Sequence, residues 1–269
     1  MIPWVFLLLV AGSHSAPTHN ETKSSLKVSR IKGGTYADIR EVPYQAQIIC
    51  NGKLICGASI IDKYWLISAA HCFNECKNNM WVMIGSSTKE TGYPYKVQSI
   101  IVHENYDKIT FDNDISLLKL SRPIEPNVNG NVKTILIAVK DPKVGDDITV
   151  SGYGEVAYGK QGEPDLKKLT IPIISHTKCQ IFYPEMTNNM FCAGYLGYSD
   201  DSCRGDSGGP AVTVKGGHYY LTGIVSFGVF CGMQSGYVTN DSLPIYYPGV
   251  YVKVRNYIPW IRAVTNLVI

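Results

Sequence analysis

The amino-acid sequence predicts an all-β protein with one helix at its C-terminal end. Short runs rich in Val, Ile and Tyr alternate with turns rich in Gly, Pro, Asn and Asp from about residue 31 to about residue 255. Runs of this length and spacing are typical of the strands of a β-barrel or a β-sandwich. Only the tail, Val254 to Val268, has apolar residues near the 3.6-residue period of a helix.

The candidate strands follow one another along the chain without a fixed repeat. In chain order the clearest are Gln45 to Cys50, Ser59 to Ser68, Trp81 to Ile84, Lys96 to His103, Ser116 to Lys119, Ile148 to Gly152, Lys168 to Ile174, Gly209 to Val214, Tyr219 to Ser226 and Gly249 to Val254. In the tail, one helix face would carry Tyr257, Ile258, Ile261, Val264 and Leu267. These elements are enough to bury a substantial core.

Composition and charge exclude several classes of protein. The chain has 269 residues, of which 45% are hydrophobic and 17% are charged, which excludes a disordered chain, a coiled coil and a collagen-like fibre. The net charge is 25 − 22 = +3. The basic residues are scattered along the sequence, so no basic stripe indicates a nucleic-acid partner.

The N-terminal residues predict secretion. The apolar run Val5 to Ala11 is followed by small residues with Ser13 and Ser15 near a plausible cleavage site, as in a signal peptide of residues 1–15. A bilayer span needs about 20 apolar residues, so this run is too short to cross a membrane. The alternative to a signal peptide is that the run forms a buried core strand. No other stretch of the sequence is long enough to span a membrane, so we expect a soluble, secreted, extracellular protein that can form disulfides.

Residues 16–30 form a polar segment rich in Ser, Thr and Lys, typical of a flexible region. The segment ends at Arg30, directly before Ile31-Lys32-Gly33-Gly34. Asn20 and Asn240 each begin a glycosylation sequon, which is a weak signal of modification.

Three residues together predict nucleophilic catalysis. His71 lies at the end of an apolar run beside Cys72, and Asp114 lies just before another apolar run. Ser207 lies within Gly205-Asp206-Ser207-Gly208-Gly209-Pro210. A serine hydroxyl is a poor nucleophile until a base within hydrogen-bond reach, itself oriented by a third group, activates it. Glycines beside the serine allow a sharp turn that aims N–H groups at an oxyanion.

The chain order His, Asp, Ser separates this arrangement from other serine hydrolases. Subtilisins have the order Asp, His, Ser, and α/β-hydrolases have the order Ser, acid, His. A lipase is therefore disfavoured.

The sequence resembles the chymotrypsin-fold serine proteases of the trypsin family over residues 31–269. The segments that carry the resemblance are Cys56-Gly57-Ala58-Ser59, those around His71, Asp114 and Ser207, Ser151-Gly152-Tyr153-Gly154, Ser226-Phe227-Gly228 and Pro248-Gly249-Val250-Tyr251. Asp62-Lys63-Tyr64-Trp65, Val102 to Asp107 and Lys143-Val144-Gly145-Asp146 are also similar to mite trypsin-like digestive proteases, the group 3 allergen type.

The resemblance implies two six-stranded antiparallel β-barrels with the catalytic residues in the cleft between them. It implies Ser207 as nucleophile, His71 as general base and then acid, and Asp114 as the group that fixes the His71 tautomer. The N–H groups of Gly205 and Ser207 would form the oxyanion hole. Residues 16–30 would be an activation propeptide cut after Arg30, so that the new ammonium of Ile31 pairs with Asp206.

The resemblance also implies the substrate pocket and the disulfides. Asp201, six residues before Ser207, would select Lys or Arg at the cleavage site, and the other pocket residues would be Ser226, Gly228 and Gly249. Family pairing gives Cys56–Cys72, Cys179–Cys192 and Cys203–Cys231. Cys50 and Cys76 then remain and would pair with each other, the alternative being two free thiols.

Departures from the family pattern leave a second interpretation open. The family usually has Val or Ile at the position of Lys32, Trp at that of Phe227 and Gly at that of Phe230. In addition, 16 residues separate Cys231 from Pro248. The main interpretation is an active, monomeric endopeptidase that acts on protein or peptide substrates and is subject to protein inhibitors. If Phe230 covered the pocket, the chain would instead be a protease-fold binding protein. The loop between Ser86 and Tyr95 holds one acid, Glu90, too few carboxylates for the family's calcium site. We expect no metal and no cofactor.

Overall fold

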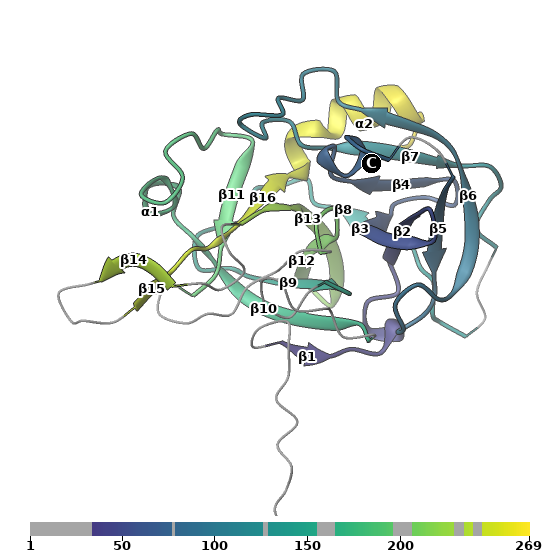
Figure 1. Ribbon diagram of the computed structural model, residues 1–269, viewed down its shortest axis with the longest axis horizontal. Coiled ribbons are helices and arrows are strands. Elements are labelled where there is room, and N and C mark those ends of the chain that lie inside the picture. The colour runs from purple at the N-terminus through teal and green to yellow at the C-terminus, as the bar shows by residue number, and fades with distance from the viewer. Residues whose placement is uncertain are drawn as a thin grey trace, which may run out of the picture.

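The computed structural model describes residues 34–76, 79–125, 129–154, 165–195, 206–228, 234–238 and 244–269. Two antiparallel β-barrels lie side by side, and the C-terminal helix crosses near the first of them (Figure 1). The predicted fold class, two six-stranded barrels with a C-terminal helix, is confirmed.

The first barrel is closed by six strands in the order β2-β3-β4-β7-β6-β5. Its strands are β2 (Gln45–Cys50), β3 (Lys53–Ile60), β4 (Trp65–Ser68), β5 (Met80–Ile84), β6 (Tyr93–Val102) and β7 (Ser116–Leu120). Side chains that point inward, such as Ile48, Leu66 and Leu118, are fully buried. Burial of aliphatic groups is the main force that holds such a barrel closed.

The second barrel is also a closed ring, because β9 pairs with both β10 and β12. Its strands are β9 (Asp147–Gly152), β10 (Lys167–Ile174), β11 (Met190–Ala193), β12 (Pro210–Lys215), β13 (His218–Phe227) and β16 (Gly249–Lys253). The short strands β1 (Thr35–Tyr36) and β8 (Leu136–Ile137) pair with β10 and β13. A separate ribbon of β14 (Gln234–Val238) and β15 (Pro244–Tyr246) extends beyond this barrel (Figure 1).

The predicted strand over Ser59 to Ser68 is wrong in its middle. The structure divides it into the end of β3 and the whole of β4, with a turn at residues 61–64. Asp62 makes this turn, because its carboxylate accepts from the Tyr64 N–H at 2.9 Å and its carbonyl accepts from the Trp65 N–H at 3.2 Å. Aspartate commonly stabilises turns in this way. Most of β3 and all of β11 were missed by the strand prediction.

The predicted helix over Val254 to Val268 is shorter than expected and begins differently. The chain forms a 3-10 turn, η3 (Val254–Tyr257), and then the helix α2 (Ile258–Thr265). Pro259 fits the first turn of α2, where no N–H is needed. Asn266 ends α2 in the left-handed region, with φ of 59°. The other short helices are η1 (Ile39–Glu41), η2 (His71–Phe73) and α1 (His176–Gln180), and no helix among the described residues could cross a bilayer.

Three disulfides join described cysteines, and all three are among the expected pairs. Cys50 is bonded to Cys76, Cys56 to Cys72 and Cys179 to Cys192. The first two tie β2 and β3 to the segment that follows His71. The expected pair Cys203–Cys231 lies outside the described residues. Disulfides of this number indicate an oxidising compartment.

Removal of the Cys50–Cys76 bridge should lower the free energy of unfolding. The bridge closes a loop with a sequence separation of 26, and restricting the unfolded chain over such a loop is worth about 3 kcal/mol. The Cys50→Ala/Cys76→Ala variant should show this loss in urea unfolding of the oxidised protein. If the bridge contributed nothing, the variant and the parent protein would unfold at the same urea concentration.

Candidate active site

His71 and Asp114 come from neighbouring strands of the first barrel. His71 begins η2, three residues after β4 ends, and Asp114 lies two residues before β7 begins. Because Ser68 in β4 pairs with Ser116 in β7, the two side chains are brought to the same rim of the barrel. Nδ1 of His71 lies 2.8 Å from Oδ2 of Asp114.

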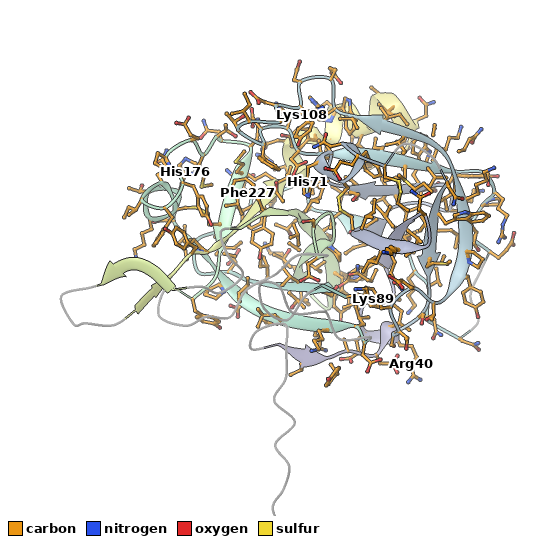
Figure 2. All side chains as sticks on the ribbon, in the orientation of Figure 1. Arg40, His71, Lys89, Lys108, His176 and Phe227 are labelled. Atoms are coloured by element: carbon orange, nitrogen blue, oxygen red, sulfur yellow. A yellow bond between two sulfur atoms is a disulfide. The ribbon has the colours of Figure 1, made fainter. Side chains whose placement is uncertain are left out.

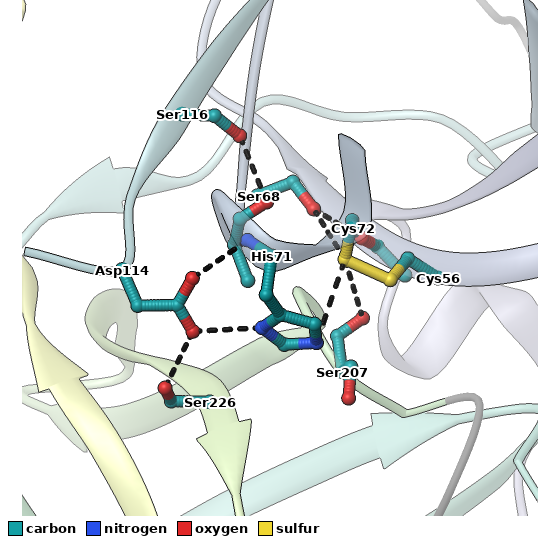
Figure 3. Close-up of a disulfide and its surroundings, with 10 residues drawn as sticks. Cys56, Ser68, His71, Cys72, Asp114, Ser116, Ser207 and Ser226 are labelled. Carbon is teal, nitrogen blue, oxygen red and sulfur yellow. Dashed lines mark hydrogen bonds and ion pairs between the residues drawn. A yellow bond between two sulfur atoms is a disulfide. The ribbon is translucent and has the colours of Figure 1, made fainter. Parts of the chain in front are cut away.

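The second barrel completes the environment of Asp114, whose side chain is fully buried. Its Oδ1 accepts from the His71 N–H at 2.8 Å, and its Oδ2 also accepts from the Ser226 hydroxyl at 2.5 Å (Figure 3). A buried carboxylate is tolerated when its oxygens are satisfied by donors such as these. With Nδ1 as the donor to Asp114, Nε2 is the ring nitrogen that faces away from the carboxylate and can accept a proton.

Ser207 lies in a turn that the first barrel holds from behind. Its carbonyl accepts from the Gly57 N–H at 2.7 Å. Gly208, with φ of +78°, follows it, and a Cβ there would lie 2.1 Å from Ser68 Oγ and 2.6 Å from the Gly57 carbonyl. Only glycine fits this conformation and this space. The glycine-rich sequence after the serine is therefore required by contact between the barrels.

Figure 3 shows Ser207 beside the Nε2 edge of the His71 imidazole. Neither the hydroxyl nor the N–H of Ser207 has a hydrogen-bond partner among the described residues. Catalytic hydrogen bonds are often long in proteins without substrate and shorten in the complex. The described residues therefore leave the Ser207 hydroxyl and N–H available to another molecule.

Asp206, the residue before Ser207, is buried against Gly152. Its exposed fraction is 2%, and its Oδ1 accepts from the Gly154 N–H at 2.9 Å. A Cβ on Gly152 would lie 2.1 Å from the same oxygen. Gly152 is therefore needed for Asp206 to occupy its place.

Aromatic side chains line the approach to His71. The ring centre of Phe111 lies 5.7 Å from that of the His71 imidazole and 5.2 Å from that of Phe227. Figure 2 shows Phe227 close to His71. Burial and the charge of Asp114 raise the pKa of Tyr106 to about 12. Burial, and then the charges of Asp112 and Asp114, also raise the pKa of Tyr257. Both phenols therefore stay protonated at neutral pH.

The structure describes only some of the predicted site residues. His71, Asp114, Ser207 and Ser226 lie together; Gly249 is buried on β16, and Gly228 is exposed just after β13. The predicted residues outside the described part of the chain are Arg30, Ile31, Asp201, Cys203, Gly205, Phe230 and Cys231. The sequence prediction did not include Phe111, Asp112 or Asn113 among the site residues, although all three directly precede Asp114.

The comparisons with known proteins agree with this geometry. The protein-family model described as Trypsin matches residues 31–261. The chain belongs to the trypsin family of serine proteases. It is 36% identical to "Serine protease 1" of Homo sapiens over 268 residues, covering 97% of each chain. It is 36% identical to "Anionic trypsin" of Bos taurus over the same length and coverage, and 35% identical to "Trypsin" of Xenopus laevis over 240 residues, 87% of this chain and 90% of the relative.

Membership of the trypsin family implies protein substrates and raises the question of calcium. In the loop between β5 and β6, the Glu90 carboxylate accepts from the Leu54 N–H at 3.0 Å. Nε2 of the buried Gln47 donates to the carbonyls of Thr88 and Thr91, both at 3.2 Å, and Oε1 of Gln47 accepts from the Glu90 N–H at 2.6 Å. The Thr88 and Thr91 carbonyls and the Glu90 carboxylate of this loop thus accept hydrogen bonds from the protein, and one carboxylate is too few for a calcium site.

Another group of possible ligand atoms does not fit a metal either. The possible ligand atoms of Cys56, His71 and Cys72, the two Sγ atoms and a ring nitrogen, lie within 4.8 Å of one another. The two cysteines are joined in a disulfide, so neither can offer the thiolate that metals bind.

Chelation of calcium should leave the stability of this trypsin-family chain unchanged. Since Gln47 closes the loop between β5 and β6, we expect the same melting temperature in excess EDTA and in millimolar calcium. A cation bound to the native state would raise the melting temperature with its concentration. A calcium-dependent rise in differential scanning fluorimetry would contradict this prediction.

Gly152→Ala should impair activity because the new methyl group overlaps Asp206. The displaced carboxylate would disturb the turn that carries Ser207, and we expect kcat/KM to fall by about tenfold or more. Gly217→Ala is the control for backbone strain alone, because Gly217 has φ of +77° but no atom lies within 4 Å of a Cβ at that position. Equal activity of the two variants would show that the packing of Asp206 against Gly152 does not matter for catalysis.

Proposed function

We propose that this chain is a secreted trypsin-like serine endopeptidase, made as a zymogen, that hydrolyses peptide bonds after Lys or Arg through Ser207, His71 and Asp114. The observation that carries the proposal is the buried Asp114 carboxylate, 2.8 Å from Nδ1 of His71. This contact orients the imidazole so that its other nitrogen is on the side of Ser207 (Figure 3).

The proposed reaction begins with proton transfer from Ser207 Oγ to His71 Nε2 as the oxygen attacks the scissile carbonyl. The N–H groups of Ser207 and Gly205 would donate to the oxyanion of the tetrahedral intermediate. His71 then gives the proton to the leaving amine, and water releases the acyl group by the same steps in reverse order. Throughout, the negative Asp114 stabilises the imidazolium and keeps its proton on Nδ1.

We base the Lys/Arg specificity on the resemblance at Asp201 and on the small residues Gly228 and Gly249. A carboxylate at the base of a closed pocket requires a cationic partner, since an unpaired buried charge is expensive. Gly249 pairs with Ala193 on β11, so both strands carry a small residue at this point. Small side chains there leave room for a long P1 side chain.

The zymogen proposal rests on the N-terminal segments and on Asp206. Residues 1–15 would be removed as a signal peptide, and cleavage after Arg30 would free the ammonium of Ile31. We propose that this ammonium pairs with Asp206, whose carboxylate is buried next to the nucleophile. The charge pair would order the turn that carries Ser207. Secretion agrees with the three disulfides among the described residues.

A finer relationship is inferred from sequence segments alone. We infer similarity to mite trypsin-like proteases of the group 3 allergen type from Asp62 to Trp65, Val102 to Asp107 and Lys143 to Asp146. The names of the relatives reported above do not include such a protein.

The experiment compares the full chain before and after cleavage following Arg30. The cut protein should hydrolyse an arginyl ester and its Ser207 should react with a serine-directed phosphonate, whereas uncut protein should do both far more slowly. Ser207→Ala, the control, should abolish both reactions. Cut protein that is labelled but turns over no arginyl ester would indicate that Phe230 covers the pocket. Cut protein that shows neither reaction would favour the alternative of a protease-fold binding protein.

A further inference from the structure

The loop that carries Asp114 is held by side chains from the second barrel. Oδ1 of Asp112, two residues before Asp114, accepts from the Thr187 hydroxyl at 2.6 Å and from Nδ2 of Asn189 at 3.0 Å. Thr187 and Asn189 belong to the segment just before β11. Among the described residues, this carboxylate forms no ion pair, and it is held by neutral donors alone.

The donors on the second barrel are themselves fixed in orientation. The Thr187 oxygen accepts from the Asn189 N–H at 3.2 Å, so its own proton is directed to Asp112. Oδ1 of Asn189 accepts from Nδ2 of Asn256 at 3.0 Å, which leaves the Nδ2 of Asn189 to face Asp112. A donor pair held in this way gives up little freedom when it binds an acceptor.

Asn113 provides a second link across the same boundary. Its Oδ1 accepts from the Tyr257 hydroxyl at 3.1 Å, and its Nδ2 donates to the Asn105 carbonyl at 2.9 Å. Tyr257 is buried in η3, next to α2. Asn113 therefore connects the loop both to its own barrel and to the C-terminal segment.

The backbone around Asp112 is unusual. Phe111 and Asn113, on either side of it, have φ of 58° and 55°. Asparagine tolerates the left-handed region, but for a bulky residue such as phenylalanine it is an outlier. Strained conformations persist where the surroundings impose them, and they are common at functional sites. The Ile115 N–H then bonds the Asn113 carbonyl at 2.8 Å, which makes a tight turn around Asp114.

We propose that Asp112, Thr187 and Asn189 form an inter-barrel clasp that positions Asp114, and through it His71, for catalysis. The proposal rests on the proposed function of the triad. None of the three is hydrogen-bonded to His71 or Ser207, so they are positioning residues. Asp114 accepts from His71 of the first barrel and Ser226 of the second, and both bonds require the Asp114 loop to keep its register between the barrels.

The clasp explains why the strained loop is stable in one conformation. If the bonds from Thr187 and Asn189 were lost, Phe111 and Asn113 could relax toward ordinary backbone conformations. Asp114 lies one residue after Asn113, so relaxation would move its carboxylate relative to the imidazole. A displacement of about 1 Å in a catalytic group can reduce the rate by about a hundredfold.

The principal test uses the Thr187→Val and Thr187→Ser variants of the activated protein. Valine has the same shape without the donor, and serine keeps the hydroxyl. We expect Thr187→Val to lower kcat on an arginyl ester about tenfold or more with little change in KM, and serine to restore most of the loss. The proton NMR signal of the His71 Nδ1–H should shift or broaden in the valine variant only, and this measurement requires no turnover.

Thr213→Val is the matched control, because its hydroxyl makes a 2.7 Å hydrogen bond to Thr222 that joins β12 to β13, not to the loop that carries Asp114. It should keep full activity at a comparable loss of stability. Asp112→Asn, which keeps an acceptor oxygen, should remain active, and Asp112→Ala should not. Asp112→Ala and Thr187→Val combined should lose no more activity than Asp112→Ala alone, because coupled residues are not additive.

The clasp and the proposed function fail in different ways. If wild-type protein neither hydrolyses the ester nor reacts with the phosphonate, the proposed function is wrong, whereas the His71 signal still tests the clasp. If wild-type protein is active but Thr187→Val matches Thr213→Val in kcat and in the His71 signal, the clasp is overturned. Multiplicative losses in the combined variant would also overturn it.

Discussion

The burial of the Asp114 carboxylate is the constraint on which the rest of this structure depends. A charged group with no exposed surface is stable only when donors surround it, and here they come from both barrels: His71 from the first, Ser226 from the second. The cost of burying Asp114 thus becomes a requirement that the two barrels dock in one arrangement. The same bonds orient the imidazole on which the proposed chemistry depends.

Close backbone contact maintains that arrangement behind the nucleophile. A Cβ on Gly57 would lie 2.9 Å from the Cα of Gly209, and one on Gly208 would overlap Ser68. The Ser151 hydroxyl also donates to the buried Gln45 at 2.7 Å across the barrels. Glycine allows the approach, and the hydrogen bonds give it direction. The cleft is therefore a property of the docked pair of barrels.

Two interactions within the first barrel hold its loops in place. Gln47 uses both ends of its side-chain amide to close the loop before β6. The Cys50–Cys76 bridge anchors the segment after His71 to β2. Neither interaction contacts the imidazole.

By itself the sequence determined the fold class, the family and the three candidate catalytic residues, because these depend on local patterns. Alternating apolar runs specify strands, and the short motifs around His71, Asp114 and Ser207 are specific enough to identify wherever they lie. The sequence could not place the break at Asp62 or the start of α2, because a turn or a helix end depends on a few polar bonds rather than on a long pattern. Only the tertiary structure decided the surroundings of Asp114, including Asp112, Thr187 and Asn189. Thr187 and Asn189 lie 75 and 77 positions after Asp112 along the chain, and they meet it only because the barrels dock.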